Sequence, residues 1–88
     1  MYSDTELDRR VRWGSQKADR YGLTLPADVA TFVALLFEIS PRFFKQPAIH
    51  RILTDPRIPP DKRMQAVIDR TPAAAWDEAA EQHDGWFE

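Results

Sequence analysis

The chain has few residues whose types and spacing could support catalysis or metal binding. His50 and His83 are far apart, and neither lies in an H-x-x-H or H-E-x-x-H motif, which would place two ligands on one helix face. The sequence has no cysteine and only three glycines. It therefore offers no thiolate ligand, no cysteine nucleophile and no glycine-rich loop that could hold a phosphate. We expect no metal, no cofactor and no enzymatic activity.

Aromatic residues outside the core pattern are better candidates for a function. Trp, Tyr and Arg are enriched among the residues that dominate binding energy at protein interfaces. The candidate partner-binding residues are five aromatics and one arginine: Trp13, Phe43, Phe44, Trp86, Phe87 and Arg42. A chain of 88 residues also needs rings to complete its own core, so core packing is the alternative for each ring.

The charged residues are unevenly distributed. The formal net charge is -2, yet all twelve Lys and Arg lie in residues 1–71. Residues 72–88 have no Lys or Arg and five acids: Asp77, Glu78, Glu81, Asp84 and Glu88. Such asymmetry is typical of an electrostatic contact surface, with a solvated final helix as the alternative. Arg9, Arg10 and Arg12 could contact a nucleic acid, but the net acidic chain favours a solvated basic face and no nucleic-acid partner.

The elements that must position these residues are organised around residues 26–39, PADVATFVALLFEI. Helical spacing predicts one apolar stripe, formed by Val29, Phe32, Val33, Leu36 and Phe37. A second stripe lies beside it, formed by Ala30, Ala34, Leu35 and Ile39. We expect other helices to surround this one. Fourteen residues span roughly 21 Å, which is too short to cross a membrane.

Helix start and stop signals predict four further helices. Ser3 and Glu6 form a capping box that starts the first, and Gly22 suits the left-handed position after its end. Pro47, Pro60 and Thr71-Pro72 start the others. On the first helix we expect an apolar seam formed by Leu7, Val11, Gly14, Ala18 and Tyr21. On the fourth we expect a core-facing stripe formed by Met64, Val67 and Ile68.

No segment alternates with the period of a strand, and no hairpin signal joins two β-branched runs. The predicted fold is all-α: a single domain over residues 1–88, folded as a compact bundle of about five short helices around the central helix 26–39. The chain begins Met1-Tyr2-Ser3-Asp4, with no basic region that leads into a hydrophobic run, so we expect no signal peptide and a cytoplasmic protein.

Part of the chain resembles a known family. The shared features are turn and helix-boundary residues: Tyr21-Gly22, Asp28-Val29, Phe32-Val33, Ser40-Pro41, Phe43, Ile52-Leu53, Asp55-Pro56, Pro60 and Arg63-Met64. By these residues the chain resembles small bacterial helical proteins found beside type VI secretion effector genes. The likeness covers about half of the chain. The chain differs from that pattern at Arg42, where the family has an acid. The tail after Thr71 is not part of the likeness.

The resemblance implies an accessory protein, or co-chaperone, that binds an effector or its larger adaptor chaperone. We therefore expect a non-enzymatic protein-binding module with aromatic anchors. The alternative is an immunity protein that neutralises a toxin through the acidic segment 77–88, and a third possibility is a DNA-binding regulator. The sequence predicts no particular oligomeric state.

Overall fold

The computed structural model describes residues 3–81 and 86. Within these residues the chain forms five α-helices and no strand, which confirms the predicted all-α fold. The elements are α1 (Asp4–Arg20), α2 (Pro26–Glu38), the 3-10 turn η1 (Phe43–Lys45), α3 (Pro47–Leu53), α4 (Pro60–Arg70) and α5 (Ala73–Ala80). The radius of gyration is 12.4 Å, close to the ~12 Å of a compact chain of this length. None of the described helices combines the length and apolar character needed to cross a membrane.

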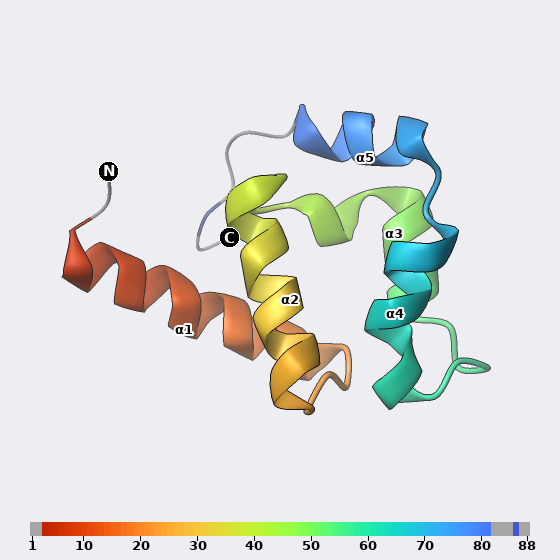
Figure 1. The fold of residues 1–88 in the computed structure, drawn as a ribbon, viewed down its shortest axis with the longest axis horizontal. Coiled ribbons are helices and arrows are strands. Elements are labelled where there is room, and N and C mark those ends of the chain that lie inside the picture. The colour runs from red at the N-terminus through yellow and green to blue at the C-terminus, as the bar shows by residue number, and fades with distance from the viewer. Residues whose placement is uncertain (1–2, 82–85, 87–88) are drawn as a thin grey trace.

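Helix α2 lies at the centre of the bundle, as predicted. Figure 1 shows α3 and α4 running alongside it, while α1 crosses it at one side and α5 lies across the end of the bundle. Phe32 and Leu36 of α2 are fully buried. Helix α1 makes the most extensive contact with α2, and its N-terminal half leads away from the other helices (Figure 1).

The ends of α1 form as the sequence predicts. The Ser3 side chain accepts a hydrogen bond from the Glu6 backbone N–H at 3.2 Å. At the other end, the Gly22 N–H donates to Asp19 O at 2.9 Å and the Leu23 N–H donates to Ala18 O at 3.1 Å. These two bonds define a Schellman motif, and Gly22 has the left-handed φ of +79° that this motif requires.

Aromatic rings fill the core between α2 and the connector that follows it. The rings of Phe32 and Phe43 have centroids 5.0 Å apart, and Phe32 and Phe44 lie 5.6 Å apart. The Arg42 N–H donates to Ser40 Oγ at 2.9 Å and so tightens the turn before η1. Both rings of η1 are consequently directed into the core, where Trp76 of α5 stacks on Phe43.

Arg63 of α4 holds together three separate parts of the chain. Its guanidinium donates to Ile58 O and to Tyr21 O, each at 3.0 Å, and to Asp55 O at 3.4 Å. The end of α1, the loop between α3 and α4, and α4 itself therefore meet at one cation. Ile58 in this loop is buried.

Two details of the later helices differ from the sequence prediction. Ile68 was expected to face the core, but it is exposed, and Ala66 is buried in its place beside Met64 and Val67. At 100° per residue, the buried face of α4 runs from Met64 through Val67 to Ala66, and Ile68 lies beyond the Met64 edge of that face. Thr71 does not cap α5. The helix begins at Ala73, and Pro72 occupies the N-cap position.

Candidate protein-binding site

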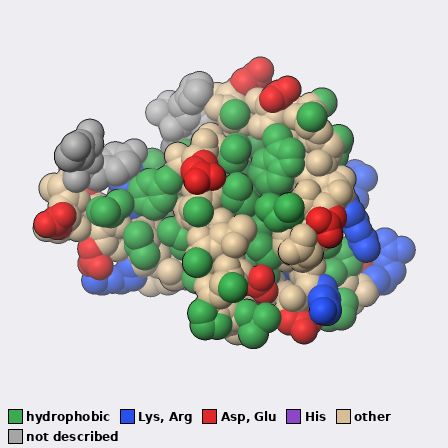
Figure 2. All heavy atoms as spheres, viewed as in Figure 1, with side chains coloured by type: hydrophobic (Ala, Val, Ile, Leu, Met, Phe, Trp, Pro, Cys, Tyr) green, Lys and Arg blue, Asp and Glu red, His purple; other side chains and the backbone are tan. Residues whose placement is uncertain are grey.

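An open apolar groove lies between α1 and α2. It has a volume of about 590 Å³. Two residues of α1 and five of α2 line it: Val11, Ser15, Pro26, Val29, Ala30, Val33 and Ala34. Figure 2 shows hydrophobic side chains exposed over these two helices. We call this surface the α1–α2 groove.

Gly14 brings the two helices close together beside the groove. A Cβ atom at this position would lie 2.6 Å from Leu36 Cδ1 and 3.2 Å from Val33 Cγ2. The first distance is shorter than a Cβ contact allows, so any larger residue here would displace the buried Leu36 side chain. Gly14 therefore allows close contact between α1 and the central helix.

The groove presents no unsatisfied hydroxyl. Ser15 is its one polar residue, and its hydroxyl donates to Val11 O at 2.9 Å. Thr31, on the adjacent turn of α2, donates in the same way to Ala27 O at 2.9 Å. Both hydroxyls are therefore paired within their own helices. A ligand in the groove would be held by apolar contact and shape.

The apolar surface continues past both ends of the groove. Leu7, one turn before Val11 on α1, is 43% exposed, Val11 is 41% exposed, and Leu25 before Pro26 is 47% exposed. Contiguous exposed apolar surface of this kind is typical of interaction sites.

The sequence prediction that Leu7 and Val11 pack in a core seam was wrong. Only Gly14 and Ala18 in the second half of α1 are buried, because the first half extends beyond the helices that could cover it. The sequence reasoning also missed Ala30 and Ala34 as surface residues. The small size of these two side chains, compared with Leu35 and Ile39 in the same stripe, was the available signal.

The opposite face of α1 carries an aromatic cluster. The Trp13 and Trp86 ring centroids lie 5.5 Å apart, and Trp86 lies 4.9 Å from Phe37 of α2. Trp13 also contacts Phe44 in the core, at 6.2 Å. Trp86 therefore links the C-terminal part of the chain to α1 and α2.

Two cations lie over this cluster. Arg10 Cζ is 4.6 Å from the centroid of the Trp86 ring, and Lys17 Nζ is 5.4 Å from that of Trp13. Desolvation lowers the pKa of Lys17, and the nearby charges of Arg20 and Lys45 lower it further. Cation–π contacts of this type stabilise the packing of exposed rings by about 0.5–1 kcal/mol each.

The structure separates the predicted partner-binding residues into different environments. It brings Trp13 and Trp86 together, and both are half-buried against each other. The prediction that Phe43 and Phe44 are exposed anchors was wrong, because the core encloses both rings. Phe87 lies outside the described residues.

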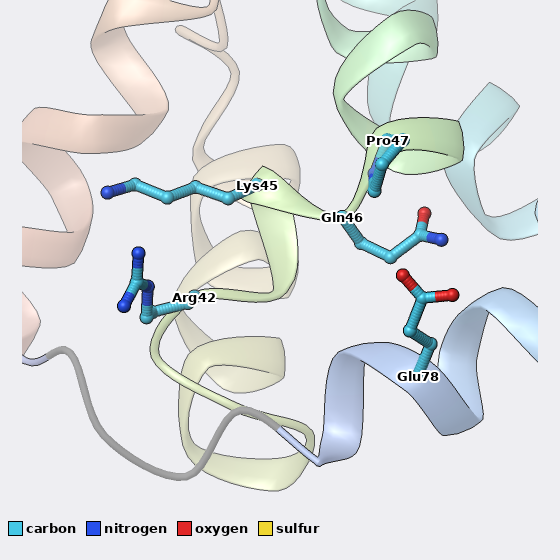
Figure 3. A pocket seen from close by; sticks show the side chains of 5 residues that line it. All are labelled: Arg42, Lys45, Gln46, Pro47 and Glu78. Atoms are coloured by element: carbon cyan, nitrogen blue, oxygen red, sulfur yellow. The ribbon is translucent and has the colours of Figure 1, made fainter.

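Arg42 lines a shallow pocket of about 210 Å³ with Lys45, Gln46, Pro47 and Glu78. Figure 3 shows Arg42 and Lys45 extending to the same side, with the Glu78 carboxylate facing the Gln46 amide. Gln46 Oε1 already accepts the backbone N–H groups of Ala48 and Ile49, at 2.7 and 3.0 Å, as the cap of α3. The pocket therefore has positive side chains and one carboxylate around the Gln46 amide, whose oxygen already accepts two hydrogen bonds.

The structure also locates most of the charged residues considered for nucleic-acid and toxin binding. On α1, Arg12 pairs with Asp8 and Arg10 stacks on Trp86, so both side chains have partners inside the protein. At the end of the chain, Asp77, Glu78 and Glu81 are exposed. Asp84 and Glu88 lie outside the described residues.

Histidine and carboxylate side chains form no metal-binding constellation in the part of the chain that the structure describes. No three of them come together there in a group that could hold a metal ion. His50 instead packs edge-on against Tyr21, whose hydroxyl lies 3.4 Å from His50 Nδ1. His83 lies outside the described residues. No protein-family model, no curated protein and no solved structure matches this chain.

Proposed function

We propose that this chain is a non-enzymatic protein-binding module whose contact surface is the α1–α2 groove. The observation that carries the proposal is the apolar lining of the groove, in which Ser15, the one polar residue, is already hydrogen-bonded. The exposed Leu7 and Leu25 extend the same surface. Burial of such a surface against a partner is favourable by roughly 25 cal/mol per Å² of apolar area.

The proposed setting is type VI secretion in the bacterial cytoplasm, with an effector or its adaptor chaperone as the partner. This part of the proposal is based on the sequence resemblance. Gly22 and Arg63, two of the residues that carry it, hold the corner between α1 and α4. The groove supplies a surface for the binding role.

Capture of the neighbouring effector and adaptor chaperone tests this function. The tagged chain would be co-expressed with each, and the complex measured by co-purification. Replacement of both groove alanines, Ala30→Gln with Ala34→Gln, should abolish capture, because two larger polar side chains fill the groove. The matched control is Ala73→Gln with Ala74→Gln, at exposed alanines of α5, and it should capture normally. Equal capture by both double variants would contradict the proposal.

A second candidate is an immunity protein, favoured by the exposed carboxylates of Asp77, Glu78 and Glu81 at the end of α5. They could oppose a basic toxin site. The test is rescue of cells that express a toxin encoded nearby. Rescue that is lost in Asp77→Asn with Glu78→Gln, and kept in the groove double variant, would support this candidate over the co-chaperone role.

A further inference from the structure

The acidic rim of the α1–α2 groove indicates what chemistry its occupant has. We propose that the groove receives an amphipathic α-helix of the partner, with large aliphatic side chains on one stripe and Lys or Arg on its flanks. This inference rests on the proposed function and specifies the partner element.

Carboxylates flank the groove on both helices. On α1, Asp4, Asp8 and Asp19 are spaced from Ser15 by multiples of helical turns, so they lie in the row beside the groove. On α2, Glu38 lies one turn beyond Ala34. All four are exposed.

Among the residues that the structure describes, one of these acids has an ion-pair partner. Arg12 pairs with Asp8. Within the described residues no ion pair is formed by Asp4, Asp19 or Glu38. The rim is therefore net negative, and cations on the flanks of a docked helix would complement it.

The walls of the groove favour a helix over an extended peptide. Both walls are α-helices whose backbone groups pair internally, and the Ser15 hydroxyl is also paired. A peptide that binds by adding a β-strand depends on main-chain hydrogen bonds to an exposed sheet edge, and neither wall of this groove is a strand. A helix satisfies its own backbone and needs only apolar contact.

The small side chains of the groove suit close helix packing. Ser15 on one wall, with Ala30 and Ala34 on the other, leaves room for large aliphatic residues. Packed helices approach to 8–10 Å between axes, depending on the side chains at the contact. A third helix would thus complete a three-helix layer with α1 and α2.

A second copy of this chain is a poorer occupant. In a two-fold dimer the same surface faces itself. The acidic rim would then oppose a second acidic rim, and like charges placed opposite each other are unfavourable.

The test uses two labelled 20-residue helical peptides with the same leucine stripe, one with lysine flanks and one with glutamate flanks. Fluorescence anisotropy measures binding to the full chain. The lysine peptide should bind about tenfold or more tightly than the glutamate peptide at low salt, and the difference should shrink at 0.5 M salt because screening weakens exposed charges. A lysine peptide with serine in place of leucine should not bind, which excludes attraction by charge alone.

Variants of the protein locate the binding. Ala30→Gln with Ala34→Gln should abolish binding of the lysine peptide, whereas Ala73→Gln with Ala74→Gln should leave it unchanged. Neutralising the rim with Asp4→Asn, Asp19→Asn and Glu38→Gln should remove most of the preference for lysine flanks while circular dichroism shows an unchanged fold.

Several outcomes would overturn the inference. They are equal binding of both peptides, binding that the groove variant does not reduce, or self-association in sedimentation that the groove variant abolishes, which would assign the groove to a second copy. If no peptide binds but the chain still captures an effector or adaptor through Ala30 and Ala34, the helix inference fails and the proposed function stands. If the lysine peptide binds in the groove but the chain captures neither an effector nor an adaptor chaperone, the helix inference stands and the proposed function fails.

Discussion

At the scale of single residues, Arg63 and Gly22 fix the corner where α1, α4 and the preceding loop meet. Arg63 donates to the carbonyl oxygen of Tyr21, and Gly22 provides the left-handed turn that presents this carbonyl. A Cβ on Gly22 would also lie 3.1 Å from Pro60 Cβ, against the first turn of α4. The corner therefore depends on one cation and one residue without a side chain.

Replacement of Arg63 by lysine should destabilise the fold by about 2–3 kcal/mol. A guanidinium reaches three carbonyl oxygens in different directions, whereas an ammonium on a similar stem cannot replace this geometry. Hydrogen bonds from charged donors contribute about 1.5–3 kcal/mol. Urea unfolding measures the change, with Arg51→Lys on the exposed face of α3 as the control. A similar loss in both variants would show that the carbonyl contacts contribute little.

Asp55 should make part of the stability depend on pH. Its carboxylate accepts hydrogen bonds from the Arg57 side chain and backbone N–H, and these bonds, helped by the charge of Arg57, hold the pKa of Asp55 below its usual value. A carboxyl with a lower pKa in the folded state stabilises the fold above its unfolded pKa of about 3.9, and this contribution is lost as the pH falls toward the folded pKa.

The variant Asp55→Asn should therefore be less stable than the wild type at pH 7, and the difference should shrink below about pH 4. Urea titrations at pH 7, 5 and 3 measure it. A difference that stayed constant over this range would mean that Asp55 acts through the shape of its turn and not through its charge.

At the scale of elements, α1 is divided into a packed half and an exposed half. Its second half meets α2 at Gly14 and Ala18, and its first half presents Leu7 and Val11 to solvent. The packed half stabilises the fold, and the wall of the groove runs from Val11 in the exposed half to Ser15 in the packed half. The two halves should therefore respond differently to substitution.

Leu36→Ala in α2 should cost about 2–5 kcal/mol, because it empties a fully buried site. Leu7→Gln and Val11→Gln should each change stability by no more than about 0.5 kcal/mol, because these side chains remain largely in water. Chemical denaturation compares the three variants. A cost of several kcal/mol for Leu7→Gln would indicate that the first half of α1 is packed in solution.

Local signals in the sequence predicted most element boundaries. Pro26, Pro47 and Pro60 each occupy the first turn of a helix, and Gly22 ends α1, because these residues act on the backbone where they stand. Whether another helix buries an apolar helix face depends on distant parts of the chain, so local signals could not predict it. Apolar spacing alone could not distinguish the exposed Val11 from a core residue.

The same limit applies to the candidate site. The aromatic residues were recognisable as candidates, but composition could not show that η1 turns both Phe43 and Phe44 inward. That outcome depends on the turn at Ser40 and on Trp76, which is distant in sequence. The groove became visible only when α1 was placed against α2.

At the scale of the whole molecule, three tryptophans join distant parts of the chain to one core. Trp13 lies on α1, Trp76 stacks on Phe43 from α5, and Trp86 packs on Trp13 and Phe37. Since these rings contact each other or share neighbours in the core, α1, α5 and residue 86 should lose their packing together. The domain should then unfold as one cooperative unit.

Urea unfolding followed by tryptophan fluorescence and by far-ultraviolet circular dichroism should give coincident transitions, with a slope of roughly 1 kcal/mol per molar urea for a domain of this size. Two variants separate the fluorescence of Trp13 and Trp86 from that of Trp76. Trp76→Phe leaves fluorescence from Trp13 and Trp86, and Trp13→Phe with Trp86→Phe leaves it from Trp76. Each variant should again give coincident curves, at its own midpoint.

An earlier fluorescence transition in the Trp76→Phe protein alone would contradict this expectation. It would mean that α1 and residue 86 separate from the bundle before the core around Phe32 and Phe43 unfolds. Both walls of the groove belong to α1 and α2, so such early separation would also remove the binding surface while the remaining helices stayed folded. Coincident transitions would instead mean that the groove persists for as long as the core does, because α2 supplies residues to both.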